Sequence, residues 1–239
     1  MIRINLWSGP RNISTAMMYS FEQRNDAQVV DEPLYAHYLY VSRAPHPGRE
    51  EVLASQENDG RKVIEKILSD DWKMPVVFFK QMTHHLVNLP LDFLSQTKNI
   101  LLIRNPKDVL ISYSKVIENP VLFDIGIKQS YDLWRFLEAK NFHRIIVDAN
   151  EVLKNPEAML MKLCKNLGIE FQSAMLHWEA GARKEDGVWA KYWYQNVHQS
   201  TGFAPFEKEE KKLPERMMKI YEKAKPFYDF LFEKSLKAY

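Results

Sequence analysis

Residues 2–18 of this 239-residue chain read IRINLWSGPRNISTAMM. The apolar run over residues 2–7 has the composition of a buried strand, and Gly9-Pro10 ends it. A helical pattern that opens near Ser14 follows directly. A strand, a short loop and a helix N-terminus in this order direct backbone N–H groups toward an anion. The segment therefore predicts a site for a phosphate or sulfate group.

This loop differs from the nucleoside-triphosphate loop of kinases, which reads Gly-x-x-x-x-Gly-Lys-Ser/Thr. Counted from Gly9, the last three positions of that pattern hold Ser14, Thr15 and Ala16. The second glycine, the lysine and the hydroxyl that binds magnesium are therefore missing. Arg11 and the two hydroxyls remain, and they suit an anion bound without a metal ion. The structural alternative is an ordinary strand-to-helix turn that Ser14 or Thr15 caps.

Composition sets broad limits on the function. The chain has a formal net charge of +2, with 46% hydrophobic and 27% charged residues, and its basic residues are not gathered in runs. These values are typical of a globular enzyme, so we expect a small-molecule partner and no nucleic acid. No apolar run approaches the roughly 18 residues of a membrane span, and the first residues read as a strand rather than a leader. We therefore expect no membrane partner and a cytoplasmic location. The single cysteine, Cys164, is predicted to be a core thiol.

Runs typical of strands alternate with helical patterns along the first 168 residues. Most of the strand-like runs are continuously apolar, as in strands that helices cover on both faces. We therefore predict an α/β fold for one domain, residues 1–239, with an open three-layer sheet of about five parallel strands. The predicted strands are Ile2–Trp7, Gln28–Asp31, Pro75–Lys80, Asn99–Arg104 and Arg144–Asp148. The predicted helices are Ile13–Arg24, Arg61–Leu68, Pro106–Ile117, Ile127–Ala139, Pro156–Leu167 and Leu213–Leu236, and Arg183–Pro205 is predicted to be a long functional loop.

Ligands of open parallel sheets bind beyond the carboxyl ends of the strands, so the residues at these ends are candidates for a site. The fourth strand ends at Arg104, and Ser112 follows about two turns into the next helix. An arginine fork and a hydroxyl at this spacing can share one phosphate. The other strand ends carry titratable residues, which are Asp31, Glu32, Lys80 and Asp148.

The run from Arg104 to Ser112, Arg-Asn-Pro-Lys-Asp-Val-x-x-Ser, resembles the 3′-phosphate signature of sulfotransferases that use 3′-phosphoadenosine-5′-phosphosulfate (PAPS). The loop over residues 10–15 is similar to their 5′-phosphosulfate loop, with Ile13 in place of the family glycine. This resemblance implies the P-loop-like sulfotransferase fold of a bacterial-type small-molecule enzyme, with PAPS as the sulfuryl donor, adenosine 3′,5′-bisphosphate (PAP) as the product and no metal. It implies that the following residues bind the nucleotide: Pro10, Arg11, Asn12, Ile13, Ser14, Thr15, Arg104 and Ser112.

Two further family motifs fit less closely. Many members carry a late Arg-Lys-Gly that grips the 3′-phosphate, and here Arg183 and Lys184 are separated from Gly187 by two acidic residues. The resemblance implies that these two cations bind the 3′-phosphate. The cytosolic branch carries Lys-x-His after the third strand, and here Lys80 is followed only later by His84 and His85.

Sulfuryl transfer needs an acceptor oxygen in line with sulfur, a base for its proton and positive charge where the nucleotide departs. The resemblance assigns the positive charge to Arg11 and Lys80, and it assigns the base to His85, His84 or the rival Glu32. Each assignment has a structural alternative. The histidines could cap the turn, Glu32 could lead a helix, and Lys80 could be a solvated strand end.

The segment Tyr35–Glu51 is expected to cover the acceptor. Arg43 and Arg49 in this segment favour a small polar acceptor, anionic ones included, that offers a hydroxyl or an amine. Two other functions stay open. One is a phosphotransferase of the P-loop kinase or NTPase type, and the other is a non-catalytic relative that binds PAP. The sequence does not predict the oligomeric state.

Overall fold

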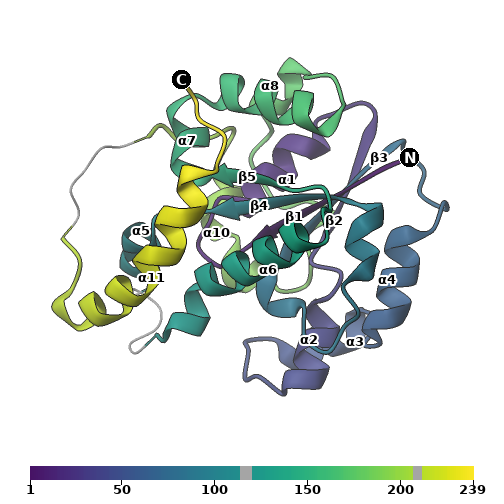
Figure 1. Ribbon diagram of the computed structural model, residues 1–239. Helices are drawn as coiled ribbons and strands as arrows, with labels where there is room; N and C mark the ends of the chain where they lie inside the picture. Colours follow the sequence, from purple (N-terminus) through teal and green to yellow (C-terminus); the bar gives the residue numbers. More distant parts are fainter. Residues whose placement is uncertain (114–119, 207–211) are drawn as a thin grey trace.

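The computed structural model describes residues 1–113, 120–206 and 212–239. Five parallel strands form one sheet in the order β2-β3-β1-β4-β5 (Figure 1). The strands are β1 (Ile2–Ser8), β2 (Ala27–Asp31), β3 (Val76–Met82), β4 (Lys98–Ile103) and β5 (Ile145–Asp148). The predicted α/β sheet is confirmed, and each strand lies within two residues of its predicted bounds.

Helices connect the strands and cover the sheet. They are α1 (Ser14–Glu22), α2 (Tyr35–Ser42), α3 (Arg49–Ser55), α4 (Gly60–Leu68), α5 (Pro106–Tyr113), α6 (Ile127–Ala139), α7 (Ala149–Lys154), α8 (Pro156–Leu167), α9 (Ala190–Trp193), α10 (Gln195–His198) and α11 (Glu215–Glu233). The bounds of α6 and α8 match the prediction because the sequence marks their ends: Asn155 caps α8 through the N–H of Ala158, and Gly168 ends it with φ of 76°.

Two predicted helical segments end earlier in the structure than predicted, and a third lies partly outside the described residues. Five helices, α2, α3, α7, α9 and α10, were not predicted. Residues 114–117 of the predicted helix Pro106–Ile117 lie outside the described residues. The last helix ends at Glu233, and the N–H of Leu236 instead donates to the Ile146 carbonyl at 2.9 Å, beside β5. The first helix ends at Glu22, two residues before its predicted end. The short helices α2, α3 and α7 carry too few turns for a clear period in the sequence.

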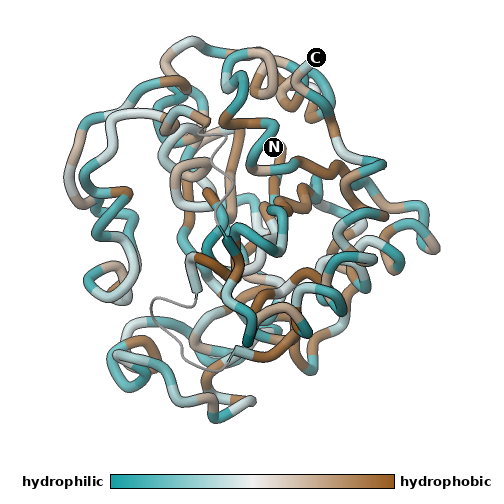
Figure 2. The backbone as a smooth tube through the Cα atoms, turned by 90° about the vertical axis from the view of Figure 1, so that its left-hand side faces the viewer, coloured by the Kyte–Doolittle hydropathy of each residue, from teal (hydrophilic) through white to brown (hydrophobic). Residues whose placement is uncertain are grey.

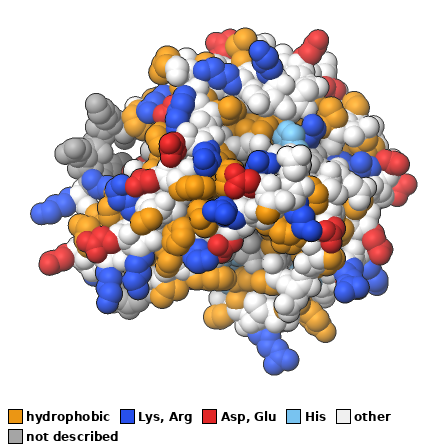
Figure 3. Space-filling model, in the orientation of Figure 1, with side chains coloured by type: hydrophobic (Ala, Val, Ile, Leu, Met, Phe, Trp, Pro, Cys, Tyr) orange, Lys and Arg blue, Asp and Glu red, His pale blue; other side chains and the backbone are white. Residues whose placement is uncertain are grey.

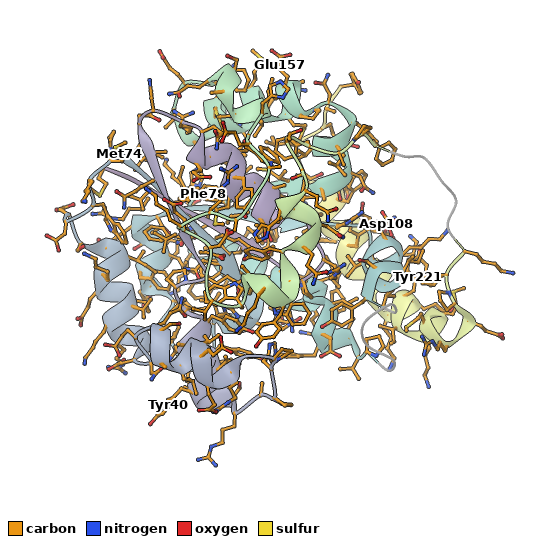
Figure 4. All side chains as sticks on the ribbon, turned by 180° about the vertical axis from the view of Figure 1, so that it is seen from behind. Tyr40, Met74, Phe78, Asp108, Glu157 and Tyr221 are labelled. Atoms are coloured by element: carbon orange, nitrogen blue, oxygen red, sulfur yellow. The ribbon has the colours of Figure 1, made fainter. Side chains whose placement is uncertain are left out.

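Two apolar cores lie on the two faces of the sheet. Helices α1 and α8 pack on one face, and α4, α5, α6 and α11 pack on the other. Neighbouring residues of β3 serve both cores: Phe78, labelled in the interior in Figure 4, stacks on Phe21 at 4.1 Å, and Phe79 meets Trp72 at 5.3 Å. Burial on both faces explains why the sequence of this strand is a continuous apolar run. Figure 2 shows segments of hydrophobic residues, in brown, in the interior of the molecule.

A third, smaller apolar cluster lies beyond the carboxyl end of β2. It joins α2 and α3 to the segment around α9, with Tyr35, Leu39 and Val52 packed against Trp189 and Tyr194. Figure 1 shows α2 and α3 together at one end of the molecule. The cluster therefore brings residues 187–205 over the carboxyl edge of the sheet.

The remaining surface and core features agree with the composition. Cys164 is buried as predicted. On the face drawn in Figure 3, basic and acidic side chains are interspersed with apolar ones. In the part of the chain that the structure describes, no helix is both long and apolar enough to span a bilayer.

Candidate active site

The strand order reverses beside β1, because α1 follows β1 on one face of the sheet and α5 follows the neighbouring β4 on the other. Such a reversal opens a crevice at the carboxyl ends of the strands. A cavity of about 470 Å³ lies there. Its lining includes these predicted site residues: Pro10, Arg11, Asn12, Ile13, Ser14, Thr15, Glu32, Lys80, His85, Arg104 and Ser112.

The loop before α1 presents an open helix N-terminus to the cavity. Ile13 occupies the N-cap position and no described side chain caps the helix, so the alternative of a turn capped by Ser14 or Thr15 is wrong. The first N–H groups of a helix have no partner within it and carry a partial positive charge. Gly9 lets the loop lie close to the turn before α6, because an added Cβ would lie 2.4 Å from the Ile125 carbonyl oxygen. The loop thus has the geometry of an anion site.

Arg11 joins the two predicted anion motifs. Its Nε donates to Ser112 Oγ at 3.0 Å, and its carbonyl oxygen accepts a hydrogen bond from Arg104 Nη1 at 3.0 Å. The Nε of Arg104 is buried without a hydrogen-bond partner among the described residues. Two guanidinium groups and a hydroxyl therefore meet at one side of the cavity, and a buried N–H is left for a ligand to accept.

Lys80 lies at the centre of a buried polar cluster. Its side chain is 2% exposed, so the alternative of a solvated strand end is wrong. The Nζ donates to Asp31 Oδ1 at 2.9 Å, to Tyr194 Oη at 2.7 Å and to Glu32 Oε1. Burial lowers the pKa of Lys80, but the carboxylates of Asp31 and Glu32 outweigh it and hold this pKa well above its ordinary value. Lys80 is thus a buried cation.

Glu32 turns back toward Lys80 from the end of β2. Its φ of 40° lies in the left-handed region, its N–H donates to the Lys80 carbonyl at 2.8 Å, and its carbonyl accepts from the Tyr35 N–H at 3.0 Å. Helix α2 begins only at Tyr35, so Glu32 does not lead it as a first-turn carboxylate. Burial, with a further contribution from Asp31, raises the pKa of Glu32 against the opposing effect of Lys80.

His85 is held between aromatic rings beside Glu32. Its ring stacks on Tyr35 at 4.9 Å and on Tyr38 at 5.1 Å, and its Nε2 lies 3.8 Å from Glu32 Oε2. Nδ1 is buried and has no hydrogen-bond partner among the described residues. Burial and the nearby His84 and Lys80 hold the pKa of His85 well below its ordinary value. The imidazole is therefore neutral near pH 7.

His84 does not line the cavity. Its Nε2 donates to the Phe123 carbonyl at 2.7 Å, and its ring meets the Phe123 ring edge to face at 5.0 Å. This contact matches the structural alternative in which the histidine bonds a neighbouring turn.

Arg183 and Lys184 also lie outside the cavity lining. Arg183 sits on the outer side of α1, with its Nε 3.5 Å from Glu22 Oε2 and its guanidinium 5.1 Å from the Tyr19 ring centre. The side chain of Lys184 is 88% exposed and pairs with Glu185 at 3.3 Å. The inserted acidic residues explain this placement, because Asp186 accepts from the Arg183 N–H and from the Tyr19 hydroxyl and so ties the segment to α1.

Only part of the segment Tyr35–Glu51, which was expected to cover the acceptor, lines the cavity. Tyr35 and His46 line the cavity and bond each other at 2.8 Å between Tyr35 Oη and His46 Nδ1. Arg43 is exposed, while Arg49 pairs with Glu50 and donates to the Leu39 carbonyl. Neither arginine lines the cavity, so the basis for an anionic acceptor is missing.

The sequence predicted a functional loop over Arg183–Pro205 but did not indicate which of its residues line the cavity. The segment carries α9 and α10 and lines the cavity with Trp189, Trp193, Tyr194, Asn196, Val197, Ser200, Gly202, Phe203 and Ala204. The aromatic density around Tyr194 was the only signal. No spacing rule connects this density to the strand ends that it covers.

Comparison with known proteins places the chain in a family. The family model described as a sulfotransferase domain matches residues 2–235. The branched-chain-amino-acid aminotransferase-like proteins 2 and 1 of Arabidopsis thaliana are 39% and 38% identical to it over 230 and 229 residues, which is 95% of this chain in each case. The chain spans 41% of the length of each of these curated relatives, and their name describes those longer proteins.

Solved structures share the fold at low identity. The sulfotransferase domain from the curacin biosynthetic pathway (14% identity, 94% of this chain and 97% of that chain) and the sulfotransferase domain of the Synechococcus PCC 7002 olefin synthase (16%, 93% and 94%) each give a TM-score of 0.56. A sulfotransferase from Alicyclobacillus acidocaldarius (11%, 99% and 97%) gives the same value. These likenesses confirm the predicted fold, and with the match over residues 2–235 they confirm the resemblance read from the sequence: the chain belongs to the sulfotransferase domain family.

Proposed function

We propose that this chain transfers a sulfuryl group from PAPS to a hydroxyl or amine of a small acceptor. The contact between Arg11 Nε and Ser112 Oγ carries the proposal, because it joins the loop motif to the strand-four motif within one cavity. Lys80, Glu32 and His85 line the same cavity. Anion-binding groups and a proton-transfer group are thus available to one bound donor.

The residues around α1 suit a donor that carries two anionic ends. The uncapped N-terminus of α1 and the loop over residues 10–15 would hold the 5′-phosphosulfate. Arg104, Ser112 and Arg11 would hold the 3′-phosphate, and the unpartnered Nε of Arg104 supplies a donor for it. Because Arg11 Nε is bonded to Ser112, we assign the Arg11 guanidinium to this phosphate side and leave the departing oxygen to Lys80.

In the reaction, the acceptor oxygen attacks sulfur while the bond from sulfur to the 5′-phosphate oxygen breaks, and PAP leaves with that electron pair. The Lys80 cation stabilises the charge that develops on the departing phosphate. The acceptor proton passes to a carboxylate or imidazole within the same cavity. These residues complete the transfer without a step that requires a metal ion.

We assign the base to Glu32 rather than to His85, because burial changes the basicity of the two groups in opposite directions. Burial raises its pKa, so its carboxylate holds a proton more strongly than an ordinary glutamate does, whereas His85 has a lowered pKa. One oxygen of Glu32 accepts from Lys80, and the other lies 3.8 Å from His85 Nε2. We assign proton acceptance to Glu32 Oε2 and the orientation of that oxygen to His85.

Calorimetric titration of the chain with PAP in magnesium-free buffer tests the proposal, with ATP and adenosine 5′-phosphosulfate as controls. We expect PAP to bind and both controls to bind far more weakly. A preference for ATP that depends on magnesium would instead support the phosphotransferase alternative. Turnover of ³⁵S-labelled PAPS with a panel of hydroxyl and amine acceptors then separates an enzyme from a non-catalytic relative, which would bind PAP without transferring sulfate.

A further inference from the structure

The contacts of Lys80 extend to a segment more than a hundred residues away in the sequence. We call residues 186–204 the cover segment, because they lie over the carboxyl edge of the sheet and line the cavity through residues such as Trp193 and Phe203. Its Tyr194 is buried, and its hydroxyl lies 2.7 Å from Lys80 Nζ and 2.7 Å from Asp31 Oδ2. The predicted catalytic cation and the cavity cover therefore share one hydrogen-bonded contact.

The hydrogen positions at the Tyr194 hydroxyl follow from the chemistry of its neighbours. Lys80 Nζ and Trp189 Nε1, the latter at 3.2 Å, can only donate, so the hydroxyl oxygen accepts from both. The hydroxyl must then donate its single proton to Asp31, whose carboxylate can only accept. Every bonding position of the hydroxyl is thereby used, and each bond fixes the direction of the others.

Both carboxylate oxygens of Asp31 also accept hydrogen bonds. It accepts from Lys80 Nζ at 2.9 Å, from the Tyr194 hydroxyl and from the backbone N–H of Gly187 at 3.1 Å. Gly187 is the glycine that two acidic residues separate from Arg183 and Lys184, and a Cβ there would lie 2.2 Å from the Trp189 ring. Asp31 therefore neutralises Lys80, while Glu32 keeps one oxygen that accepts from no donor of the described residues within hydrogen-bond distance.

We propose that Tyr194 and Asp31 are positioning residues that hold the Lys80 ammonium at the cavity and tie its placement to the seating of the cover segment. The inference rests on the proposed function, in which Lys80 meets the departing phosphate oxygen. Without the Tyr194 hydroxyl, the ammonium loses one of its three oxygen partners, and Asp31 and Glu32 draw it toward the strand ends. The cation is then misplaced for transfer, although the residues that bind the two phosphates are unchanged.

The test compares Tyr194→Phe with Tyr192→Phe. Both changes remove one hydroxyl from the same part of the cover segment, but the Tyr192 hydroxyl bonds Glu51 at the surface and does not line the cavity. Two readouts are used for each variant. The first is the rate at which an amine-reactive ester labels Lys80, measured by mass spectrometry. The second is the release of sulfate from ³⁵S-labelled PAPS to water, with kcat and KM determined separately.

In Tyr194→Phe the cover segment is no longer bonded to the Lys80 ammonium, so we expect the reagent to label Lys80 about tenfold faster. We expect kcat to fall about tenfold, with KM and the Kd for PAP within about twofold of wild type. Tyr192→Phe should match wild type in every measurement. Asp31→Asn removes the carboxylate charge and keeps Tyr194. It should change the labelling rate and kcat in the same direction as Tyr194→Phe, so the test stays decisive if one of the two variants does not fold.

Two failures are distinguishable. Unchanged Lys80 labelling and kcat in both variants, or a loss confined to PAP affinity, would overturn the positioning role alone. Absence of PAP binding by the wild-type chain would overturn the proposed function, and the inference with it.

Discussion

The two sides of the cavity differ in how their cations are paired. On the phosphate side, formed by the loop over residues 10–15 with Arg104 and Ser112, the guanidinium groups contact a hydroxyl and a carbonyl, and one buried N–H has no partner in the part of the chain that the structure describes. On the transfer side, formed by Asp31, Glu32, Lys80, His85 and Tyr194, the ammonium is bonded to three oxygens. The phosphate side is built to receive negative charge, whereas the transfer side already contains it.

Because of this difference, substitutions on the two sides should affect ligand binding and folding stability differently. Removing an arginine from the phosphate side takes away a cation that binds the ligand, so it should weaken ligand binding. It also relieves repulsion between two neighbouring cations, so it should not unfold the protein. Removing the lysine from the transfer side leaves buried carboxylates without a counter-charge, which is strongly destabilising. Binding and stability should therefore separate along the cavity.

The largest effect is expected for Lys80→Met. The variant should lose about 3–5 kcal/mol of unfolding free energy, because Asp31 and Glu32 stay buried without their cation. It should also lose turnover by a factor of about 1,000 or more, since the departing phosphate loses its electrostatic partner. Urea denaturation and sulfate release from labelled PAPS check the two effects.

Lys80→Arg is the matched control, because it keeps the charge and should recover most of the stability but not the geometry. A Lys80→Met variant as stable as wild type would remove the distinction between the two sides of the cavity.

The next effect distinguishes the two candidate bases. Glu32→Gln should lower kcat by about 100-fold with little change in the Kd for PAP, because it removes the proton acceptor but not a phosphate ligand. His85→Phe keeps the stacking on Tyr35 and Tyr38 and should cost only about tenfold. Wild-type kcat should rise with pH through the raised pKa of Glu32, and Glu32→Gln should lose that rise. The reverse order of the two losses would assign the base to His85.

A smaller effect is expected on the phosphate side. Arg104→Ala should weaken PAP binding about 30-fold to 100-fold and change kcat less than about threefold, because the 3′-phosphate loses a charged donor. Ser112→Ala should weaken it by less than about tenfold. Calorimetry with adenosine 5′-phosphate provides the control, since this ligand lacks the 3′-phosphate and should bind both variants like wild type. Equal weakening for both nucleotides would mean that Arg104 supports the fold of the loop instead.

The two anion motifs of the phosphate side could be read from the sequence because each motif is local. The loop before α1 lies within a few residues of a strand end, and Arg104 and Ser112 are separated by about two helical turns. The hydrogen bond from Arg11 to Ser112, which joins the two motifs, links residues about a hundred positions apart and did not follow from spacing. The five strands were predictable for a similar reason, since a strand that is buried on both faces has a nearly continuous apolar sequence. The same rule exposed Lys80 as a polar residue at the end of such a run.

The transfer side was only partly predictable because its contacts are tertiary. Nothing in the sequence near Asp31 indicates that Tyr194 will bond it, and the left-handed backbone of Glu32 is unusual for a residue with a side chain. The Arg183-Lys184 pair was assigned to the 3′-phosphate by likeness to a motif. Two inserted carboxylates redirect that segment, and their effect depends on Tyr19 of α1, which lies far away in the sequence.

The smallest effect concerns a carboxylate that lies outside both sides of the cavity. It shows that the stability of the fold can change while the affinity for PAP stays the same. Burial, and then the nearby Glu185, raises the pKa of Glu22 to about 7, with Arg183 opposing the shift. The folded chain therefore holds a proton that the unfolded chain releases near pH 4.5, so stability falls as pH rises from about 4.5 to 7. Glu22→Gln removes this loss and should be about 2 kcal/mol less sensitive to pH over that interval, measured by urea denaturation at pH 5 and pH 8.

Glu65→Gln, which removes an exposed carboxylate from α4, should keep the wild-type slope. Because Glu22 does not line the cavity, its variant should bind PAP like wild type. A pH slope shared by all three proteins would place the raised pKa elsewhere, and a loss of PAP affinity in Glu22→Gln would show that the outer side of α1 is coupled to the phosphate side after all.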